Sequence, residues 1–461
     1  MTVASRSLST PGADRPHRRA AIRGRAALTA LAGGIVLMAG GCVPIGGGAE
    51  TTPSGTAQGP PPEIPSADHV TVVEPDGGAD YYAGFRDGLP SGPEFFPLGL
   101  WIGSVTAPEE ALHERRLGLN LYVDLAGGSR LDFLADGQYA ITSWRDPLSR
   151  GAVLGDEPDM WAGAGDGDWT GNYPGQGEIC VDLDTGCGYT IQKELDQAVE
   201  QDRMTYANYG KGVTFWQSDS EASIFASGPQ DVVSADNYWF TDPNICGAHE
   251  GGTMLEEPRQ LSEAECRLPA NYGWTVERVR SLVEPVGSIP VWSFVEVGQP
   301  SDAGALDPPD LPQIRAAVWS SIVHGARGIV YFGHSFGGPC QTFHVLRDCG
   351  AELADGMAEI NAEVTDLAPV LNGPELGGAL HVTGAADAIA KTYDGDLYVL
   401  ATAASPEPGR VDFLLACAQD GDATVMGEDR TVAVSGGQFA DDFTDGNAVH
   451  LYRLDGNSCD L

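Results

Sequence analysis

Lysine is scarce in this chain, where Lys193, Lys211 and Lys391 are the three lysines among 461 residues. Lysine and arginine together number 26, against 65 aspartates and glutamates, so the formal net charge is −39. A surface this acidic repels the phosphates of nucleic acid and of anionic lipid headgroups. We therefore expect neither nucleic acid nor a lipid surface as a partner, and we interpret the charge as an aid to solubility outside the cell.

Two catalytic signatures are missing from the sequence. It contains no H-E-x-x-H zinc helix and no Gly-rich phosphate loop after a strand-like segment. We therefore expect neither a cofactor nor a catalytic metal. Four acidic residues offer the oxygen ligands that calcium takes, but their spacing does not match an EF-hand loop; they are Asp166, Asp168, Asp182 and Asp184.

The N-terminal apolar run, residues 26–38, is too short to span a bilayer stably. It follows an arginine-rich segment and precedes Ala39-Gly40-Gly41-Cys42, an order that predicts an export signal over residues 1–42. The end of this run resembles the lipobox of bacterial lipoproteins, although that family usually has leucine where Ala39 stands. The resemblance implies that Cys42 is acylated and anchors the protein outside the cytoplasm on the bacterial cell membrane. Plain secretion and an uncleaved anchor are the alternatives.

Residues 43–66 are rich in Gly, Pro, Ser and Thr and have almost no apolar content. Such a segment cannot repay the entropy lost on ordering, so we expect a disordered linker.

Nine cysteines occur, and eight remain after Cys42. An even number in an exported chain favours disulfides over thiol chemistry or metal binding. The most local pairing, one of 105 for eight cysteines, joins Cys180 to Cys187, Cys246 to Cys266, Cys340 to Cys349 and Cys417 to Cys459.

From Phe96 onward, short β-branched or aromatic runs alternate with helical stretches, a pattern typical of parallel βαβ units. Eight strands are expected, which is the number that closes a (β/α)8 TIM barrel over residues 67–372. They are 96–102, 119–124, 139–143, 152–156, 204–208, 232–236, 290–296 and 328–333. Helices are expected at 107–117, 191–201, 275–286, 311–324 and 351–367. The third and fifth helices are poorly marked, so an open doubly wound sheet is the alternative.

Beyond Gly373 the helix pattern stops and short alternating strands begin, at 396–402, 411–415, 431–434 and 448–454. Short strands separated by turn residues predict a small β-sandwich over residues 373–461. The chain is therefore expected to be an α/β barrel followed by a β-sandwich.

Two of the expected strands end in carboxylates, and a barrel takes its reacting groups from these ends. The fourth runs into Asp156-Glu157-Pro158, and the seventh ends at Glu296. A helix cap would also explain Glu157, because Asp, Glu and Pro all favour a helix N-terminus. A surface acid opening a loop would explain Glu296. Strands four and seven, however, face each other across a barrel, and glycoside hydrolysis needs two carboxylates.

This layout resembles the retaining glycoside hydrolases with (β/α)8 barrels, in which the acid/base glutamate ends strand four and the nucleophile ends strand seven. The resemblance implies that Glu157 is the acid/base and Glu296 the nucleophile. Asp156 stands where that clan usually has an asparagine that binds a sugar hydroxyl. The segment 319–332 and the C-terminal strands are also similar to such enzymes.

Sugar binding requires aromatic faces and polar side chains at strand ends. We expect Asp156 and Asp236 to bind hydroxyls and His334 to donate to the substrate. The aromatic candidates are Trp101, Trp144, Tyr238 and Trp292, followed by Trp161 and Trp239. The long segments 158–189 and 239–271 follow strands four and six and are expected to wall the cleft.

The sequence thus predicts a monomeric glycosidase that acts on an oligo- or polysaccharide and touches the membrane only through its lipid anchor. The alternatives are a carbohydrate-binding lipoprotein without catalysis, either a degenerate barrel or the solute receptor of a transporter, and an interaction scaffold of the envelope. A solute receptor would have two similar lobes and a hinge.

Overall fold

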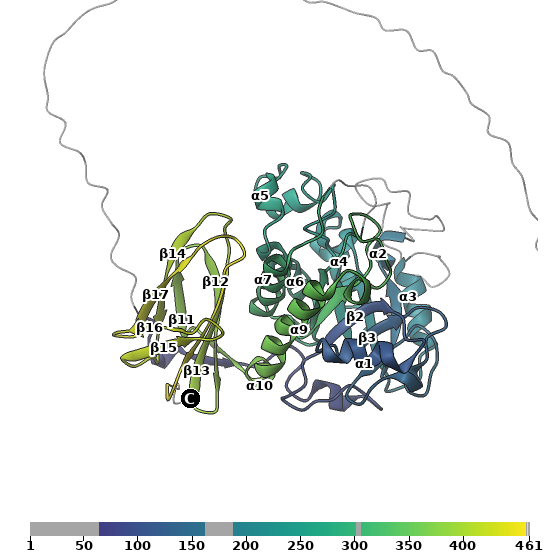
Figure 1. Cartoon of the computed structure of the whole chain (residues 1–461), viewed down its shortest axis with the longest axis horizontal. Coiled ribbons are helices and arrows are strands. Elements are labelled where there is room, and N and C mark those ends of the chain that lie inside the picture. Colours follow the sequence, from purple (N-terminus) through teal and green to yellow (C-terminus); the bar gives the residue numbers. More distant parts are fainter. Residues whose placement is uncertain (1–63, 162–187, 301–305, 458, 460–461) are drawn as a thin grey trace, which may run out of the picture. The chain divides into compact units, whose positions relative to one another are not determined.

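The computed structural model describes residues 64–161, 188–300, 306–457 and 459 (Figure 1). The export signal, Cys42, Cys180, Cys187 and the four acidic residues considered for calcium lie outside the described residues. Within them, no helix is both long and apolar enough to cross a lipid bilayer.

Eight parallel strands form the barrel, in the order β4-β3-β2-β9-β8-β7-β6-β5. A parallel bridge between Thr142 and Ala152 joins the outer strands β4 and β5, so the sheet closes on itself. All eight predicted strands are confirmed, and the open doubly wound sheet is wrong. The strands are β2 (Leu98–Gly103), β3 (Leu121–Leu125), β4 (Tyr139–Ile141), β5 (Gly151–Asp156), β6 (Met204–Tyr209), β7 (Val232–Ala235), β8 (Val291–Glu296) and β9 (Ile329–Phe332).

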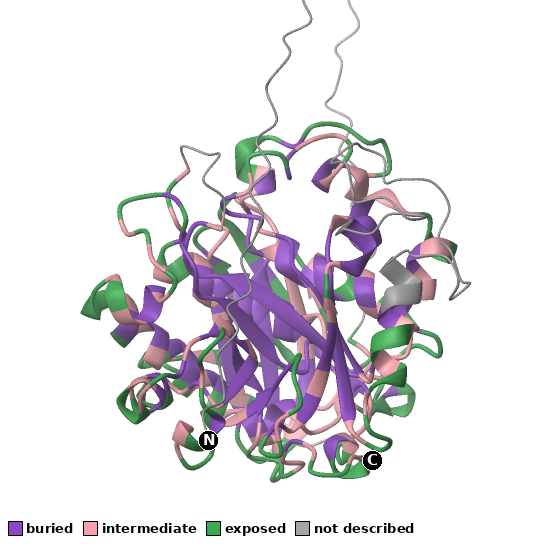
Figure 2. Cartoon of the chain, turned by 90° about the vertical axis from the view of Figure 1, so that its right-hand side faces the viewer, coloured by how far each residue is buried: buried purple, intermediate pink, exposed green. Residues whose placement is uncertain are grey.

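Large aromatic side chains fill the inside of the barrel. The rings of Trp101 and Phe294 lie 5.2 Å apart, and those of Tyr206 and Trp292 lie 5.4 Å apart. The indole N–H of Trp292 donates to the hydroxyl of Tyr82, which precedes the barrel in the sequence. The alternation of each strand therefore directs one set of side chains into this packed interior and the other toward the helices. Figure 2 shows the buried strands surrounded by helices with exposed outer faces.

The expected helices are confirmed as α1, α3, α6, α7 and α9. Helix α7 begins at a cap, because Asp310 accepts a hydrogen bond of 2.9 Å from the backbone N–H of Gln313. The described helices are α1 (Pro108–Arg116), α2 (Pro158–Trp161), α3 (Gly188–Gln197), α4 (Asp219–Ala226), α5 (Glu263–Cys266), α6 (Ala270–Leu282), α7 (Leu311–Val323), α8 (Val345–Asp348), α9 (Ala351–Asp366) and α10 (Ala368–Leu371).

The two poorly marked helical positions are irregular in the structure. Residues 142–150 connect β4 to β5 without a helix, and β6 is followed by a π-helical turn, Gly212–Trp216, before α4. The weak helix pattern in the sequence at these two positions therefore corresponds to irregular backbone in the structure.

Two antiparallel sheets make up the C-terminal sandwich, in the orders β1-β10-β12-β13-β18-β15-β16 and β11-β14-β17. Stacked rings of Phe413 and Phe439, 4.7 Å apart, lie in its core. The strands are β1 (Thr71–Val73), β10 (Glu375–Gly377), β11 (Leu380–Thr383), β12 (Ala386–Tyr393), β13 (Asp396–Ala403), β14 (Gly409–Leu415), β15 (Gly421–Val425), β16 (Arg430–Val434), β17 (Gln438–Phe443) and β18 (Val449–Leu454).

Strand β1 was not predicted. It precedes the barrel in the sequence, yet it pairs with β10 of the sandwich, with Val72 opposite Leu376. All three of its residues are exposed, so it lacks the buried alternation that would reveal a strand.

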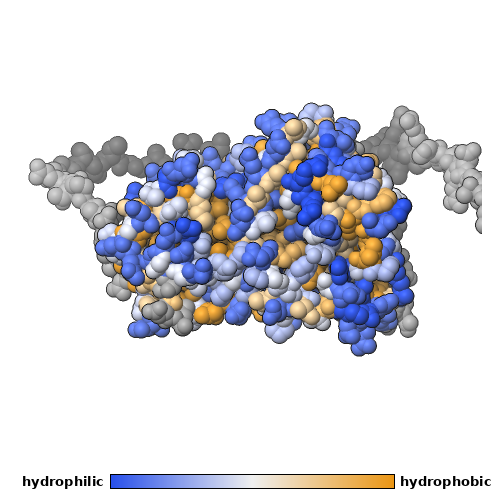
Figure 3. Space-filling view, turned by 60° about the horizontal axis from the view of Figure 1, so that its bottom comes forward, coloured by the Kyte–Doolittle hydropathy of each residue, from blue (hydrophilic) through white to orange (hydrophobic). Residues whose placement is uncertain are grey.

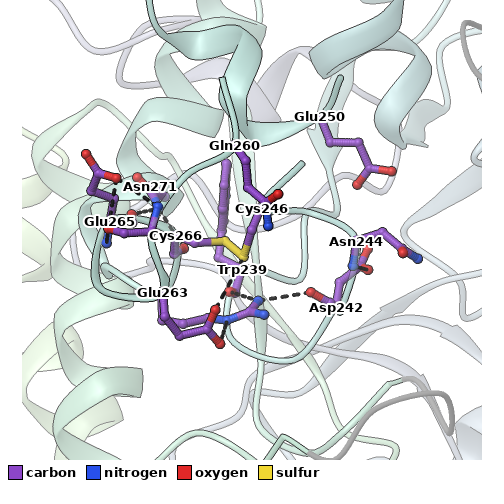
Figure 4. The surroundings of a disulfide bond; sticks show 12 residues. Trp239, Asp242, Asn244, Cys246, Glu250, Gln260, Glu263, Glu265, Cys266 and Asn271 are labelled. Carbon is purple, nitrogen blue, oxygen red and sulfur yellow. Dashed lines mark hydrogen bonds and ion pairs between the residues drawn. A yellow bond between two sulfur atoms is a disulfide. The ribbon is translucent and has the colours of Figure 1, made fainter. Parts of the chain in front are cut away.

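Three of the predicted disulfides are confirmed: Cys246–Cys266, Cys340–Cys349 and Cys417–Cys459. Figure 4 shows the first, which fastens the long segment after β7. Beside it, the guanidinium of Arg267 donates to the carbonyl oxygens of Trp239 and Asp242 and pairs with Glu263. The disulfide and the hydrogen bonds from Arg267 to two backbone carbonyl oxygens therefore hold this segment in place.

On the face that Figure 3 presents, hydrophilic residues predominate and hydrophobic ones are scattered between them.

Candidate active site

The carboxyl ends of the barrel strands carry a group of acidic side chains: Asp124 near the end of β3, Asp156 and Glu157 at the end of β5, and Asp236 after β7. The backbone near them is strained, because Ile102, Asp124 and Glu157 have φ angles of 43°, 59° and 48°. Left-handed backbone is unfavourable for these residue types and is concentrated at functional sites. The mouth of the barrel is therefore the candidate site.

Glu157 occupies a partly exposed position in this mouth. Its backbone N–H donates to the carbonyl of Asn208, which fixes it against β6. A Cβ atom at Gly210 would lie 2.8 Å from Oε1 of Glu157, so only glycine leaves room for this carboxyl group. Burial, followed by the negative charges of Asp156 and Asp159, raises the pKa of Glu157 to about 8. At neutral pH this side chain therefore holds a proton that it can donate.

Asp236 lies beside Glu157, and the charge of Glu157 acts on the carboxyl group of Asp236. Its side chain is 6% exposed, its Oδ2 accepts a bond of 2.8 Å from the Tyr238 hydroxyl, and its Oδ1 is buried without a hydrogen-bond partner. Burial and the charges of Glu157 and Asp156 raise the pKa of Asp236. Because the two groups interact, the protonation of each depends on that of the other.

A chain of polar side chains fixes Asp156. Tyr206 donates to Ser234, Ser234 to Oδ1 of Asn208, and the Asn208 amide to Oδ1 of Asp156, over distances of 2.5, 2.7 and 3.0 Å. Burial raises the pKa of Asp156, and the bond from Asn208 opposes this effect. Neither Asn208 nor Ser234 can be recognised from the sequence beyond its place near a strand end.

Glu296 has different surroundings. It is fully buried, and its carboxylate accepts hydrogen bonds from the backbone N–H of Phe240 at 2.7 Å, from the Tyr272 hydroxyl at 2.6 Å and from the Thr241 hydroxyl. Burial raises its pKa to about 7, against the effect of these donors. Among the described residues, no hydrogen bond or ion pair joins Glu296 to Glu157.

Two further charged side chains, Asp159 and Lys211, hold the segments around the barrel mouth in place. Asp159 is buried and accepts the backbone N–H groups of Gly210 and Val213, which pins the π-helical turn after β6. Lys211 bridges Asp242 and Glu250, each at 2.5 Å. The described residues contain no group of three or more His, Cys, Asp or Glu side chains arranged to hold a metal ion.

The aromatic candidates do not gather at the mouth. Trp101 and Trp292 are 3% and 1% exposed and belong to the packed barrel interior. Trp239 is fully buried and donates to Thr275. Trp144 is 36% exposed but lines a separate surface hollow with Arg86 and Arg203, among other residues. The side chain of Trp161 lies outside the described residues.

A hairpin after β9 supplies exposed aromatic rings that the sequence reading missed. Its strands meet at a bridge between Ser335 and Thr342, and the Cys340–Cys349 disulfide closes it. Phe336 and Phe343 are 38% and 62% exposed, and His334 contacts both rings.

A series of ring contacts connects this aromatic hairpin to Asp236, the neighbour of Glu157. Phe332 packs against His334 at 5.0 Å and against Tyr238 at 5.2 Å, and Tyr238 bonds to Asp236. His334 itself donates from Nε2 to the carbonyl of the strained Ile102, and burial lowers its pKa. The predicted site residues Asp236, Tyr238 and His334 therefore belong to one connected group.

The hairpin also contains Gly333-His334-Ser335-Phe336-Gly337, which matches the G-x-S-x-G pattern of serine hydrolases. Ser335 is buried here, accepts the backbone N–H of Gln299 and donates to the carbonyl of Gly337. It sits in an antiparallel hairpin rather than in the strand–turn–helix that exposes a nucleophilic serine, so the pattern is structural.

No protein-family model matches the sequence, and no curated protein matches it. Similar solved structures include an α-amylase from Geobacillus thermoleovorans in complex with acarbose, at 10% identity and a TM-score of 0.45, with 78% of this chain and 98% of that chain covered. A glycoside hydrolase family 5 protein from Bacteroides vulgatus has 13% identity and a TM-score of 0.42, with 78% and 90% covered. A GH30 endoxylanase from Clostridium papyrosolvens has 12% identity and a TM-score of 0.36, with 82% and 98% covered.

These neighbours are glycoside hydrolases with barrel folds. At such identities and TM-scores the likeness bears on neither substrate nor mechanism.

The surroundings of Glu296 predict a pH-dependent stability. Because its pKa is raised from 4.5 to about 7 in the folded protein, its contribution favours folding below pH 4.5 and is lost as the pH rises toward 7. Glu296→Gln removes this dependence. Relative to wild type, the free energy of unfolding of the variant should increase by roughly 2 kcal/mol between pH 5 and pH 8, as measured by urea unfolding. The matched control is Glu352→Gln, an exposed position in α9. A difference that stays constant with pH would contradict this assignment.

Proposed function

We propose that this protein is a glycoside hydrolase in which Glu157 is the general acid. The observation that carries the proposal is the pair of neighbouring carboxyl groups, Glu157 and Asp236, at the carboxyl ends of two barrel strands, together with the raised pKa of Glu157. Cleavage of a glycosidic bond needs one protonated carboxyl for the leaving oxygen and one carboxylate on the other side of the reacting carbon. Asp236 lies too close to Glu157 to stand on that other side, so the second carboxylate is a different group.

In this mechanism, Glu157 transfers its proton to the glycosidic oxygen while the bond from that oxygen to the anomeric carbon breaks. The electron pair of the broken bond stays on the leaving oxygen. The second carboxylate gives its electron pair to the anomeric carbon, and a water molecule later releases the sugar and returns a proton to Glu157. The sequence predicts Glu296 as this second carboxylate.

The surroundings of the pair suit a carbohydrate. The exposed Asp156, held by the buried Asn208, offers a carboxyl group for sugar hydroxyls, and the exposed rings of Phe336 and Phe343 offer apolar faces for the C–H groups of a sugar ring. The substrate would thus be an oligo- or polysaccharide long enough to reach from the carboxyl pair to the hairpin.

The two-lobed solute receptor does not fit the described residues, which form one closed barrel and a sandwich. A carbohydrate-binding barrel without catalysis is the second candidate, and activity measurements separate it from the proposal.

We expect the purified protein to hydrolyse at least one member of a panel of aryl glycosides and polysaccharides. Glu157→Gln, which keeps the shape and removes the acidic proton, should lower kcat by about 10²- to 10⁴-fold. The loss should be largest for substrates with poor leaving groups. Glycan binding without turnover by the wild-type protein would instead favour the binding lipoprotein.

The hairpin generates a separate prediction about substrate binding. Replacing Phe343 by Ala should raise KM for a polysaccharide roughly tenfold, because one stacked ring is lost, and should leave kcat within about twofold. Tyr393→Ala removes a comparably exposed ring from the sandwich and serves as control. Equal KM values for the two variants would argue against a role of the hairpin in binding.

We further propose that the protein is exported and anchored by an acylated Cys42, which leaves the enzyme outside the cytoplasm as a monomer. The support is the order of basic, apolar and small residues before this cysteine. In a bacterial host fed radioactive palmitate, the protein should be labelled and recovered with membranes. Cys42→Ser should lose the label and Ser54→Ala should keep it. Label on the Cys42→Ser protein would refute the anchor.

A further inference from the structure

We infer that the protein binds a small inorganic anion, of the size of chloride, in a cavity lined by the buried side chains of Arg327 and Lys391. The cavity has a volume of about 50 Å³. Pockets for small organic ligands measure roughly 300–1,000 Å³, so a sugar does not fit, whereas a single-atom ion with a few water molecules does. The inference is independent of the proposed function.

The cavity lies at the end of the barrel opposite to the mouth. Arg327 precedes β9, and its backbone N–H donates to the carbonyl of Val291, the first residue of β8. The amino ends of these strands therefore form one wall of the cavity. Lys391 of β12 and Glu375 of β10 are opposite each other in the sandwich sheet and line another wall. An ion here would thus contact the barrel and the sandwich without touching a substrate at the mouth.

Arg327 and Lys391 are buried cations without a carboxylate partner. Their exposed fractions are 8% and 6%, and no ion pair among the described residues includes either side chain. Lys391 donates to the carbonyl of Gly373 at 2.6 Å, and Nη1 of Arg327 donates to the carbonyl of Leu371 at 3.3 Å. Nε of Arg327 is buried without a hydrogen-bond partner. Because a buried charge without a counter-charge is costly, these two side chains require a negative charge nearby.

The acidic residues that line the cavity do not supply this counter-charge. Asp76 is buried, but its two oxygens accept hydrogen bonds from Arg280 at 2.6 and 2.8 Å, so its charge is already matched. Glu74 is exposed, and solvent therefore screens its charge. Glu375 is the cross-strand neighbour of Lys391, yet no ion pair in the described part of the chain includes it. One small anion between Arg327 and Lys391 would fill this need.

The titration behaviour of the two cations supports the same site. Burial and the positive charge of Arg327 lower the pKa of Lys391 to about 8, and the charges of Glu375 and Glu74 oppose this effect only in part. Burial also lowers the pKa of Arg327. An anion between the two side chains would reduce their mutual repulsion and favour the charged form of both. A water molecule could accept their hydrogen bonds but would not offset their charge.

An anion at this place would also join the two domains. The carbonyls of Leu371 and Gly373, which accept from the two cations, belong to the connection between α10 and β10. Arg327 belongs to the barrel and Lys391 to the sandwich, so one ion held by both would bridge the barrel, this connection and the sandwich. Because the cavity exists only in the folded protein, binding of the ion should stabilise the fold by mass action.

Thermal unfolding of the purified protein in chloride tests this inference. When sodium chloride replaces sodium gluconate at constant ionic strength and neutral pH, the unfolding temperature should rise by roughly 2–4 °C and reach a plateau. Lys391→Met keeps the length of the side chain and removes its charge, so it should abolish the rise. Arg410→Gln changes an exposed arginine of β14 and should keep the rise, as the matched control.

Crystals of the wild-type protein soaked in sodium bromide provide a measurement that needs no variant. A peak of anomalous scattering is expected in the cavity, between Nζ of Lys391 and Nε of Arg327. Water alone in this cavity would overturn the inference. Equal effects of chloride on the wild-type and Lys391→Met proteins would overturn it as well, and a bromide peak beside that result would mean an adventitious ion only.

Discussion

The candidate active site depends on the interaction between two carboxyl groups, Glu157 and Asp236, at the mouth of the barrel. Burial and the repulsion between neighbouring negative charges raise the pKa of both groups, so the pair favours protonated forms. Every other feature of the site either keeps the two groups together or limits their contact with water.

Several parts of the fold enforce that contact. Glu157 adopts a left-handed backbone, and Gly210 leaves the space that its carboxyl group fills. Asp159 pins the turn after β6 from below. On the other side, Glu296, the Cys246–Cys266 disulfide and Arg267 fix the segment that carries Tyr238. The strain at Glu157 persists because its neighbours determine its place so completely.

The sequence predicted the barrel well and the site less well. All eight strands could be located because buried parallel strands are continuous apolar runs, and the carboxylates could be located because strand ends are fixed by the same runs. The orientation of Glu296 could not be predicted, since it depends on Tyr272 and on a segment that folds back over β8. Likewise, local sequence does not distinguish Trp292, inside the barrel, from Trp144, at the surface.

The sequence contains a signal for the aromatic hairpin. The pair Cys340 and Cys349 encloses a short segment with Phe343, and Phe336 lies just before it, so a rigid exposed hairpin with aromatic rings could have been anticipated. Strand β1 offered no such signal, because its three residues are exposed and its partner β10 lies about 300 residues away in the sequence.

The most direct measurement is to trap the intermediate. The protein would be incubated with the 2-deoxy-2-fluoro analogue of its best aryl glycoside, digested, and mapped by mass spectrometry. We expect inactivation with one sugar attached to the peptide that contains Glu296, the predicted second carboxylate. A sugar on the peptide that contains Asp236 or Glu157 would contradict this assignment.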